Sequence, residues 1–289
     1  MLPTILHNIQ WNEQDDLLHT LLHPKSDIIQ HSLDQGFEAE VIKLSCAQGD
    51  LVLKIWNQQA KPDVEAQYQL LQFLLAKGIA VSKPIGWGML HNQDQVLLTT
   101  FDGTALTNMN KKKIVQTATL LSAIHHVKIT ESEYALLPKY GFIDYFFPDV
   151  AMYTDISDIL YQVMPMITLE QNRVIHGDFH LGNILTTENR YTVIDWTNGQ
   201  LGDARYDAVW SMTLQKIYIS ERYAEVFRDA YLAEHSIAEE ELHIFEALAC
   251  LRWILLARQG GITVQPQAQQ NIKQVIANNP LLAERNCEV

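Results

Sequence analysis

The first hundred residues contain short apolar runs separated by turn-forming residues, a pattern typical of β-strands. Residues 39–46 (AEVIKLSC) and 50–56 (DLVLKIW) are β-branched and aliphatic, and the turn-like AQGD that joins them predicts an antiparallel hairpin. Residues 83–90 (KPIGWGML) and 95–101 (QVLLTTF) predict two further strands. We therefore expect a small antiparallel sheet in the N-terminal part of the chain.

One helix is expected between these two pairs of strands. Pro62 opens it, and Asp63 and Glu65 follow in its first turn, where the helix dipole favours acidic side chains. Gly78 ends the segment. The apolar face of this helix is predicted to consist of four residues at helical spacing: Val64, Tyr68, Leu71 and Leu75.

Beyond residue 110 the apolar residues recur at helical spacing. This pattern predicts a helix over 114–127, another within 151–169, and three or four more after Gly202. Two short strands interrupt the helical part, around NIL (183–185) and YTVID (191–195). The predicted fold class is therefore α+β, with a small antiparallel-sheet lobe that contains one helix and a larger, mainly helical lobe.

A chain of 289 residues is long enough for two such lobes. A connector near Thr99–Gly103 is predicted to divide them. The N-terminal lobe would then comprise residues 1–100, and the C-terminal lobe residues 101–289.

Composition narrows the choice of partners. Hydrophobic residues make up 47% of the chain and charged residues 19%, which is ordinary for a globular protein and unlike a disordered one. The formal net charge of -13 argues against binding to a phosphate backbone, so no nucleic acid is expected as a partner. An acidic protein favours a cationic substrate, although a solvated acidic surface is the simpler explanation of this charge.

The chain also lacks the features of secreted and membrane proteins. Its cysteines, Cys46, Cys250 and Cys287, form no CxxC pair, which disfavours a disulfide scaffold or zinc ribbon and suits a reducing compartment. The N-terminus has no basic region followed by a long apolar core. The apolar segment IFEALACLRWILLA is interrupted by Glu246 and Arg252, as in a core helix. We expect a cytoplasmic protein without membrane association, a monomer or weak dimer.

The stretch HGDFHLGNIL, residues 176–185, concentrates polar chemistry in one place. His176 and His180 are four residues apart, like the zinc ligands of H-E-x-x-H, but that motif needs a glutamate where Gly177 stands. A zinc site is therefore disfavoured. A hydrogen-bonded polar turn ahead of a strand remains a purely structural alternative for these residues.

Phosphoryl transfer from a nucleotide explains the spacing of the same stretch better. It needs a carboxylate that orients or deprotonates the attacking hydroxyl, and amide and carboxylate oxygens that hold magnesium over the phosphates. The pattern H-x-D-x-x-x-x-N, followed by a strand and another aspartate, supplies these groups in order. Asp178 is therefore the predicted catalytic residue, and Asn183 and Asp195 are the predicted ligands of Mg²⁺.

An upstream lysine completes the predicted set. Lys54 lies in the middle of the apolar strand LVLKIW, where a solvent-facing lysine is the structural alternative. The following helix carries Glu65, a candidate ion-pair partner that would hold the Lys54 ammonium over the α- and β-phosphates. Lysine and glutamate are common residues, so this pair gains its weight from the order of the motifs that follow it.

Taken together, these motifs resemble those of the aminoglycoside phosphotransferase and choline kinase-like enzymes, small-molecule kinases with a protein-kinase-like fold. The resemblance covers nearly the whole chain. LDQGFEAEVIKL resembles the nucleotide-covering hairpin, VLKIW the lysine strand, VEAQYQLLQFLLAKGI the glutamate helix and VLLTTFDG the hinge. LLSAIHHV resembles the helix that ends in Leu-His, and VIHGDFHLGNIL, VIDW and GDARYD resemble the catalytic and metal motifs.

The resemblance implies a bilobal fold with a nucleotide-binding N-terminal lobe and a catalytic and substrate-binding C-terminal lobe. It implies ATP or GTP as co-substrate, Mg²⁺ as cofactor, and a small-molecule hydroxyl as acceptor. Aminoglycosides, choline or ethanolamine, homoserine, thiamine and sugars are acceptors among such enzymes, and the fold does not choose between them. Contacts with the nucleotide are expected from five residues: Lys54, Glu65, Gly36, Thr99 and Phe101.

Departures from the protein-kinase pattern favour a small-molecule kinase. The covering loop has the single glycine Gly36, Gly177 replaces the arginine that reads a phosphorylated activation loop, and no A-P-E segment precedes GDARYD. A nucleotide-binding pseudokinase would normally lack one of the lysine, aspartates and asparagine of the active site, and this chain keeps them all. His125, Asp203 and Asp207 are expected to be structural, with the two aspartates bracing the catalytic loop.

Overall fold

The computed structural model describes most of the 289 residues. The described ranges are 5–23, 27–32, 39–58, 60, 62–188 and 190–285. The chain divides into two compact units: Met1–Leu106 with Gly182–Asn198, and Thr107–Leu181 with Gly199–Val289. The first boundary between the units follows Leu106, close to the connector predicted near Thr99–Gly103. The prediction placed residues 182–198 in the C-terminal lobe, whereas they belong to the first unit.

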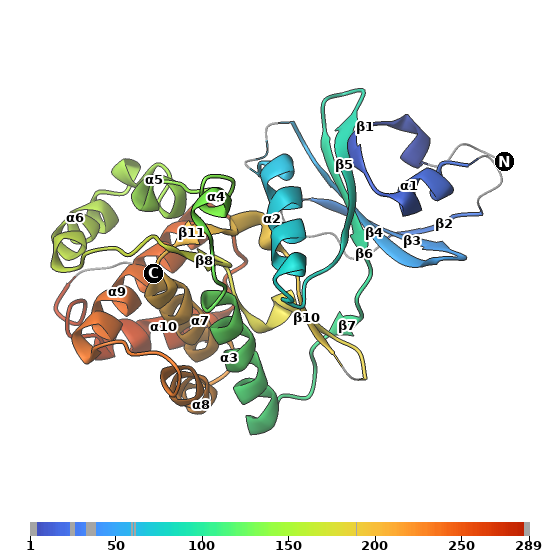
Figure 1. Ribbon diagram of the computed structural model, residues 1–289. Helices are drawn as coiled ribbons and strands as arrows, with labels where there is room; N and C mark the ends of the chain where they lie inside the picture. Colours follow the sequence, from blue (N-terminus) through green and yellow to red (C-terminus); the bar gives the residue numbers. More distant parts are fainter. Residues whose placement is uncertain are drawn as a thin grey trace. The chain divides into compact units, whose positions relative to one another are not determined.

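Within the described residues, the first unit is built on a six-stranded antiparallel sheet in the order β1-β5-β6-β4-β3-β2 (Figure 1). Its strands are β1 Ile9–Gln14, β2 Ile29–Ser32, β3 Glu40–Cys46, β4 Gly49–Trp56, β5 Pro84–Leu90 and β6 Gln95–Thr100. The predicted hairpin is β3 and β4, with Cys46 opposite Gly49 at its turn. The other predicted pair is β5 and β6, whereas β1 and β2 had no prediction.

Alternation along β4 gives the sheet two different faces. Leu51, Leu53 and Ile55 lie in an apolar core together with residues of the 3₁₀ helix η1 (Ile5–Asn8) and of α1 (Asp16–Leu21). Successive strand residues point to opposite faces, so Val52 and Lys54 lie on the other face, and both line a pocket there.

The helix α2 spans Val64–Ala76, so it begins after the predicted start at Pro62, and Asp63 precedes the first turn instead of lying in it. Asp63 caps it by accepting a hydrogen bond of 2.9 Å from the backbone N–H of Ala66. The predicted apolar face needs one correction, because Leu74 is buried whereas Leu75 is 38% exposed in the last turn. The buried face also includes a polar residue, Gln67.

A second, small sheet explains why residues 182–198 belong to the first unit. It has the order β10-β9-β7, with β7 Thr104–Ala105, β9 Ile184–Thr186 and β10 Tyr191–Val193. Val193 also forms a parallel bridge with Val81, and its N–H donates to the carbonyl of Ala80 at 2.8 Å. The two predicted short strands therefore form a hairpin that continues into the 3₁₀ helix η5 (Trp196–Asn198).

The second unit is mainly helical, as predicted. Its α-helices are α3 Lys111–His125, α4 Glu131–Tyr134, α5 Phe142–Phe146, α6 Thr154–Val163, α7 Ala204–Tyr218, α8 Glu221–Leu232, α9 Glu239–Arg258 and α10 Pro266–Asn278. A short antiparallel pair joins β8, Arg173–Ile175, to β11, Gln200–Gly202. The remaining 3₁₀ helices of the described chain are η2 Val150–Met152, η3 Met164–Met166 and η4 Leu181–Asn183.

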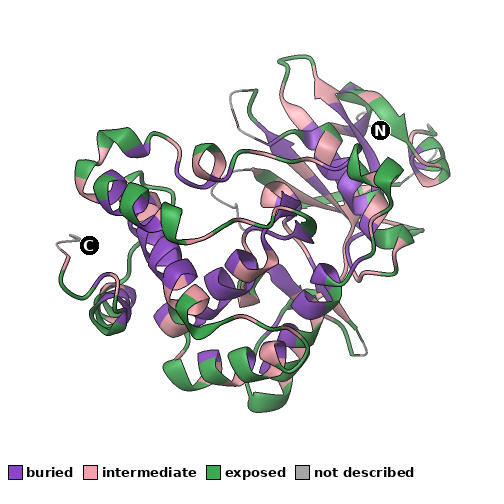
Figure 2. Ribbon diagram, turned by 60° about the vertical axis from the view of Figure 1, so that its left-hand side comes forward, coloured by how far each residue is buried: buried purple, intermediate pink, exposed green. Residues whose placement is uncertain are grey.

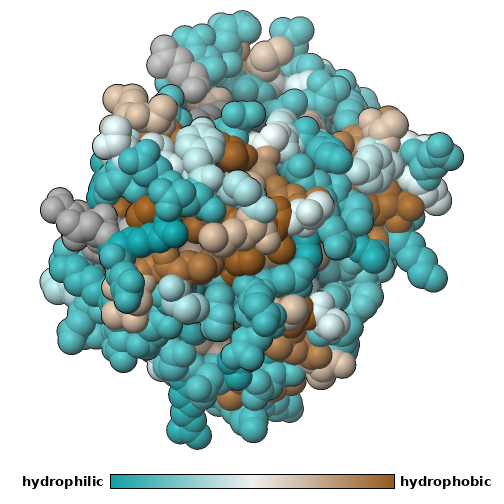
Figure 3. All heavy atoms as spheres, turned by 90° about the vertical axis from the view of Figure 1, so that its left-hand side faces the viewer, coloured by the Kyte–Doolittle hydropathy of each residue, from teal (hydrophilic) through white to brown (hydrophobic). Residues whose placement is uncertain are grey.

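The core of the second unit forms around α7 and α9, which are buried along most of their length (Figure 2). The helix α9 contains the apolar segment IFEALACLRWILLA, and in the described part of the chain no helix is both long and apolar enough to cross a membrane. The face of the molecule drawn in Figure 3 is largely hydrophilic, with smaller hydrophobic patches between the polar side chains.

Candidate active site

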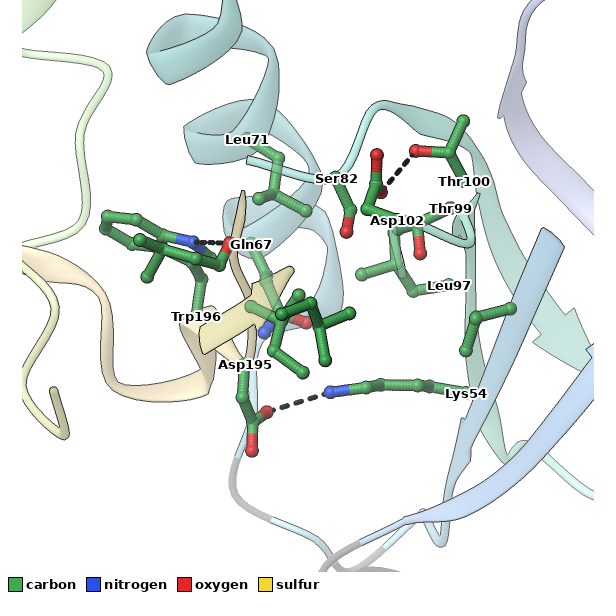
Figure 4. Close-up of a pocket in the computed structure, with 14 residues that line it drawn as sticks. Lys54, Gln67, Leu71, Ser82, Leu97, Thr99, Thr100, Asp102, Asp195 and Trp196 are labelled. Atoms are coloured by element: carbon green, nitrogen blue, oxygen red, sulfur yellow. Dashed lines mark hydrogen bonds and ion pairs between the residues drawn. The ribbon is translucent and has the colours of Figure 1, made fainter. Parts of the chain in front are cut away.

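A pocket of the first unit lies on the α2 side of the six-stranded sheet (Figure 4). Its apolar walls include Val52 and Leu97 from the sheet and Leu71 from α2. Three of the predicted site residues also line it: Lys54, Thr99 and Asp195. An apolar cavity with a few convergent polar groups is the usual form of a small-ligand site.

Lys54 and Asp195 form an ion pair in this pocket. The Lys54 Nζ lies 2.9 Å from the Asp195 Oδ1, and the two side chains are 21% and 43% exposed. Figure 4 shows the lysine reaching from β4 towards the carboxylate. Lys54 is therefore not a solvent-facing strand lysine.

The predicted pair of Lys54 with Glu65 needs correction. Glu65 lies on the exposed side of α2, where it accepts a hydrogen bond of 3.4 Å from Gln69. The described ion pairs place Lys54 with Asp195 and not with Glu65. A helix turns about 100° per residue, so Gln67, two positions further on, faces nearly the opposite way and lines the pocket instead.

The hairpin of β9 and β10 brings the two predicted metal ligands to the same end. Ile184 pairs with Val193, and the N–H of Ile194 donates to the carbonyl of Asn183 at 2.9 Å. Asn183 and Asp195 therefore lie immediately beyond paired strand ends. Sequence spacing predicted both residues, and the register of the hairpin explains their proximity.

The backbone at Asp195 is strained. Its φ is +64°, a left-handed conformation that few residues other than glycine adopt. The hydroxyl of Thr197 donates to the Asp195 Oδ1 at 3.1 Å, beside the Lys54 ammonium. Strained residues held by several contacts cluster at functional sites.

The donor set of this hairpin end fits Mg²⁺, which takes few protein ligands, all of them oxygens, and keeps several waters. Asn183 offers an amide oxygen and Asp195 a carboxylate. Among the described residues there is no cluster of three or more histidine, cysteine, aspartate or glutamate side chains suited to a metal.

Of the other three residues predicted to contact the nucleotide, one lines the pocket. Thr99 lines the pocket, but Phe101 is not among the lining residues. The N–H of Phe101 donates to the carbonyl of Asp50 at 3.0 Å, and its ring lies 4.3 Å from the Lys43 Nζ. Gly36 lies outside the described residues.

Asp178 lies in the second unit, in the loop after β8. Gly177 has a φ of +75°, which a glycine adopts without steric cost, and the loop turns sharply there. The Asp178 carboxylate accepts a hydrogen bond of 2.9 Å from the indole of Trp210, and its Oδ2 lies 3.6 Å from the His180 Nε2. The Asp178 side chain is 30% exposed, so it is oriented without being sealed from a substrate.

A buried carboxylate braces this loop from α7. The Asp207 side chain is fully buried and accepts hydrogen bonds from the N–H groups of His176, at 2.8 Å, and Gly177, at 2.9 Å. It also lies 3.1 Å from the His125 Nε2, and the His125 Nδ1 lies 2.6 Å from the hydroxyl of Tyr231. Burial alone would raise the pKa of Asp207, but the hydrogen bond with His125 and the nearby His125 and His176 rings hold it below its usual value. Asp207 and His125 thus have the structural positions that the sequence predicted.

Two residues that sequence reasoning missed also hold the loop. Arg252 is buried, donates to the carbonyl of Gly177 at 2.8 Å, and places its guanidinium 4.1 Å from the Trp210 ring centroid. The spacing of Trp210 was a usable signal, because it follows Asp207 by three residues on α7 and so shares its face. The long sequence separation between Arg252 and Gly177 gave no such signal.

Comparison with known proteins identifies the family. A model of the phosphotransferase enzyme family APH matches residues 30–245. The chain belongs to this family. The predicted family and enzyme class are therefore confirmed for this phosphotransferase. A search of curated proteins found no match.

Solved structures confirm the predicted fold class of the phosphotransferase. Spectinomycin phosphotransferase APH(9)-Ia, in complex with ADP and spectinomycin, is 15% identical with a TM-score of 0.59, and the match covers 89% of this chain and 91% of that one. A thermostable mutant of aminoglycoside phosphotransferase APH(4)-Ia, in complex with AMP-PNP and hygromycin B, is 14% identical with a TM-score of 0.66 and coverages of 89% and 96%. Ethanolamine kinase of Plasmodium vivax is 15% identical with a TM-score of 0.64 and coverages of 92% and 86%.

Proposed function

We propose that this phosphotransferase transfers the γ-phosphate of ATP or GTP to a hydroxyl group of a small molecule. The ion pair of Lys54 with Asp195 inside the pocket is the observation that carries the proposal. A strand cation and a carboxylate next to a second oxygen ligand are the groups that phosphoryl transfer needs at the phosphate end of a nucleotide.

The pocket of the first unit would bind the nucleotide. Its apolar walls, with Thr99, suit the base, and Lys54 would contact the phosphates. Asn183 and Asp195 would hold Mg²⁺, which when bound supplies positive charge against the phosphate oxygens. Glu65 is exposed on the far side of α2 and has no part in this proposal.

Asp178 would act on the acceptor. Its carboxylate would orient the attacking hydroxyl and accept the proton as the oxygen bonds to the γ-phosphorus and the nucleoside diphosphate leaves. Trp210 fixes one carboxylate oxygen, and Asp207 and Arg252 fix the loop backbone, so the carboxylate is oriented before a substrate arrives.

Two acceptor classes have direct support from similar structures. Spectinomycin and hygromycin B are bound in two of the relatives, and a third relative is an ethanolamine kinase. An aminoglycoside-type antibiotic and an amino alcohol both combine hydroxyl groups with a cationic amine. The net charge of -13 is compatible with either.

A turnover screen tests the proposal. The protein with Mg-ATP or Mg-GTP is assayed for release of nucleoside diphosphate in the presence of single aminoglycosides, amino alcohols, homoserine, thiamine or sugars. We expect one class to stimulate release in the wild type and not in Asp178→Asn. Binding of the Mg-nucleotide without turnover on any acceptor would instead support a nucleotide-binding pseudokinase.

A further inference from the structure

Gln67 is a buried polar residue in the pocket of this phosphotransferase. Its side chain points from α2 into the pocket that Lys54 and Asp195 also line, and the residue is 5% exposed (Figure 4). Its amide oxygen has no hydrogen-bond partner among the described residues. Buried polar atoms are nearly always paired, so an unpaired acceptor aimed into a ligand pocket calls for a donor.

The amide nitrogen of Gln67 begins a directed chain of hydrogen bonds. The Gln67 Nε2 donates to the Thr197 Oγ1 at 3.4 Å, and the Thr197 Oγ1 donates to the Asp195 Oδ1 at 3.1 Å. An amide nitrogen can only donate, and a hydroxyl has one proton. With its oxygen accepting from Gln67, Thr197 directs that proton to the carboxylate.

Lys54 donates to the same oxygen of Asp195, at 2.9 Å. Its ammonium group has three N–H bonds and no acceptor atom. A divalent cation on Asp195 would compete with Lys54 for that carboxylate by charge repulsion. The unpaired Gln67 oxygen is then an acceptor available to the ammonium in the same pocket.

We propose that Gln67 is a positioning residue for the metal-binding carboxylate. Through Thr197 it orients Asp195, and its amide oxygen accepts a hydrogen bond from Lys54 once a divalent cation occupies Asp195. The inference rests on the proposed function of the pocket. Because Gln67 is neutral, it would hold Lys54 by a hydrogen bond in place of an ion pair.

The test compares metal-dependent nucleotide binding across four variants. Gln67→Met keeps the length of the side chain and removes both of its polar atoms. Thr197→Val, in η5, removes the hydroxyl that links Gln67 to Asp195 by hydrogen bonds. Gln69→Met makes the same substitution on the exposed side of α2 and is the matched control. The double variant of Gln67→Met with Thr197→Val completes a thermodynamic cycle.

Affinity for AMP-PNP, or for the GTP analogue if that binds better, is measured by calorimetry over a series of Mg²⁺ concentrations and in EDTA. We expect Gln67→Met to raise the Mg²⁺ concentration for half-maximal affinity by about five- to ten-fold, the effect of one lost hydrogen bond. Affinity in EDTA should change less than about two-fold. Thr197→Val should raise this Mg²⁺ concentration by a similar factor. The free-energy cost of the double variant should be smaller than the sum of the two single costs, and Gln69→Met should match the wild type.

Two results would overturn the inference. Equal losses of affinity with and without Mg²⁺ would make Gln67 a packing residue, and a wild-type Mg²⁺ requirement in Gln67→Met and Thr197→Val would remove its link to Asp195. If Gln67→Met does not fold, as judged by circular dichroism, Thr197→Val alone decides. A wild-type protein that binds no Mg-nucleotide would instead contradict the proposed function together with this inference.

Discussion

The two carboxylates at the centre of the proposed reaction are held in opposite ways. Asp178 belongs to a loop whose backbone is held by hydrogen bonds with a fully buried aspartate, Asp207, and with the buried guanidinium of Arg252. Asp195 is nearly half exposed and is held by the Lys54 ammonium and the Thr197 hydroxyl. The buried hydrogen bonds hold the first loop rigidly, whereas the ion pair of Asp195 with Lys54 can be exchanged for a ligand.

The difference matches the proposed roles. A group that receives a proton must be oriented before the substrate arrives, and buried hydrogen bonds to the loop backbone provide that orientation. A group that binds a metal must release a competing cation when the metal arrives, and a partly exposed ion pair such as that of Asp195 with Lys54 costs little to break. The comparison predicts that variants of the two regions will separate catalysis, stability and nucleotide affinity.

The largest effect is expected at Asp178. Asp178→Asn keeps the oxygen that accepts from Trp210 but removes the proton acceptor, so kcat should fall by about 10²–10⁴-fold. Calorimetry should show almost unchanged affinity for the Mg-nucleotide. A variant that keeps more than about a tenth of the wild-type kcat would contradict the role of Asp178 as the general base.

Asp207→Ala should have the largest effect on stability. It leaves the N–H groups of His176 and Gly177 buried without their acceptor, so the free energy of unfolding should fall by about 3–5 kcal/mol. Asp195→Ala is the comparison, with an expected loss below about 1 kcal/mol because that pair is partly exposed. Chemical denaturation measures both, and equal losses would remove the proposed contrast between the regions.

Lys54→Met should affect the nucleotide without unfolding the protein. It removes a charge-assisted contact worth about 1.5–3 kcal/mol. The nucleotide KM should rise, or kcat fall, by roughly ten- to a hundred-fold in steady-state kinetics. Wild-type kinetics would show that the Lys54–Asp195 pair serves only the structure of the first unit.

The pH dependence of the free energy of unfolding should show the contribution of Asp207 in acid. Its pKa in the folded protein is below the unfolded value of 3.8, so its contribution to stability is complete above that value and is lost as the pH falls through the lower folded pKa. Below pH 3.8 the free energy of unfolding should therefore decrease less steeply in Asp207→Asn than in the wild type. Denaturation curves at a series of acidic pH values measure how steeply the free energy of unfolding falls with pH in each protein. Identical slopes in the two proteins would contradict the lowered pKa of Asp207.

The smallest effect is expected at Glu65. Its side chain is exposed and contacts Gln69 rather than Lys54, so Glu65→Gln should change the nucleotide KM by less than about two-fold, within the range of a surface substitution. A defect comparable to that of Lys54→Met would restore the ion pair that the sequence suggested.

The sequence predicted those features that depend on local pattern. Apolar runs on either side of a turn identified β3 and β4, and helical spacing after Pro62 identified α2. The spacing of Asp178, Asn183 and Asp195 indicated the polar loop. Apolar runs indicated the two short strands, β9 and β10, but not their pairing as a hairpin. Local pattern also produced the main error. The acidic residue in the first turn of α2 suggested Glu65 as the partner of Lys54, whereas the helical phase turns Gln67 into the pocket.

Residues that act through tertiary contacts could not be read from the chain. Arg252 reaches Gly177 across 75 positions, and the place of residues 182–198 in the first unit depends on the pairing of β9 with β7 and of Val193 with Val81. No periodicity or spacing encodes such contacts. These contacts hold the loop of Asp178 in place and bring Asp195 to the pocket.

Metal-dependent nucleotide binding by Asp195→Ala tests the central claim most directly. Calorimetric titration with AMP-PNP or its GTP counterpart is carried out on the wild type and the variant, in Mg²⁺ and in EDTA. If Lys54 and Asp195 mark the phosphate end of a nucleotide site, the wild type binds more tightly with Mg²⁺ and the variant loses most of that gain. Equal affinity of the two proteins for the Mg-nucleotide would contradict the account.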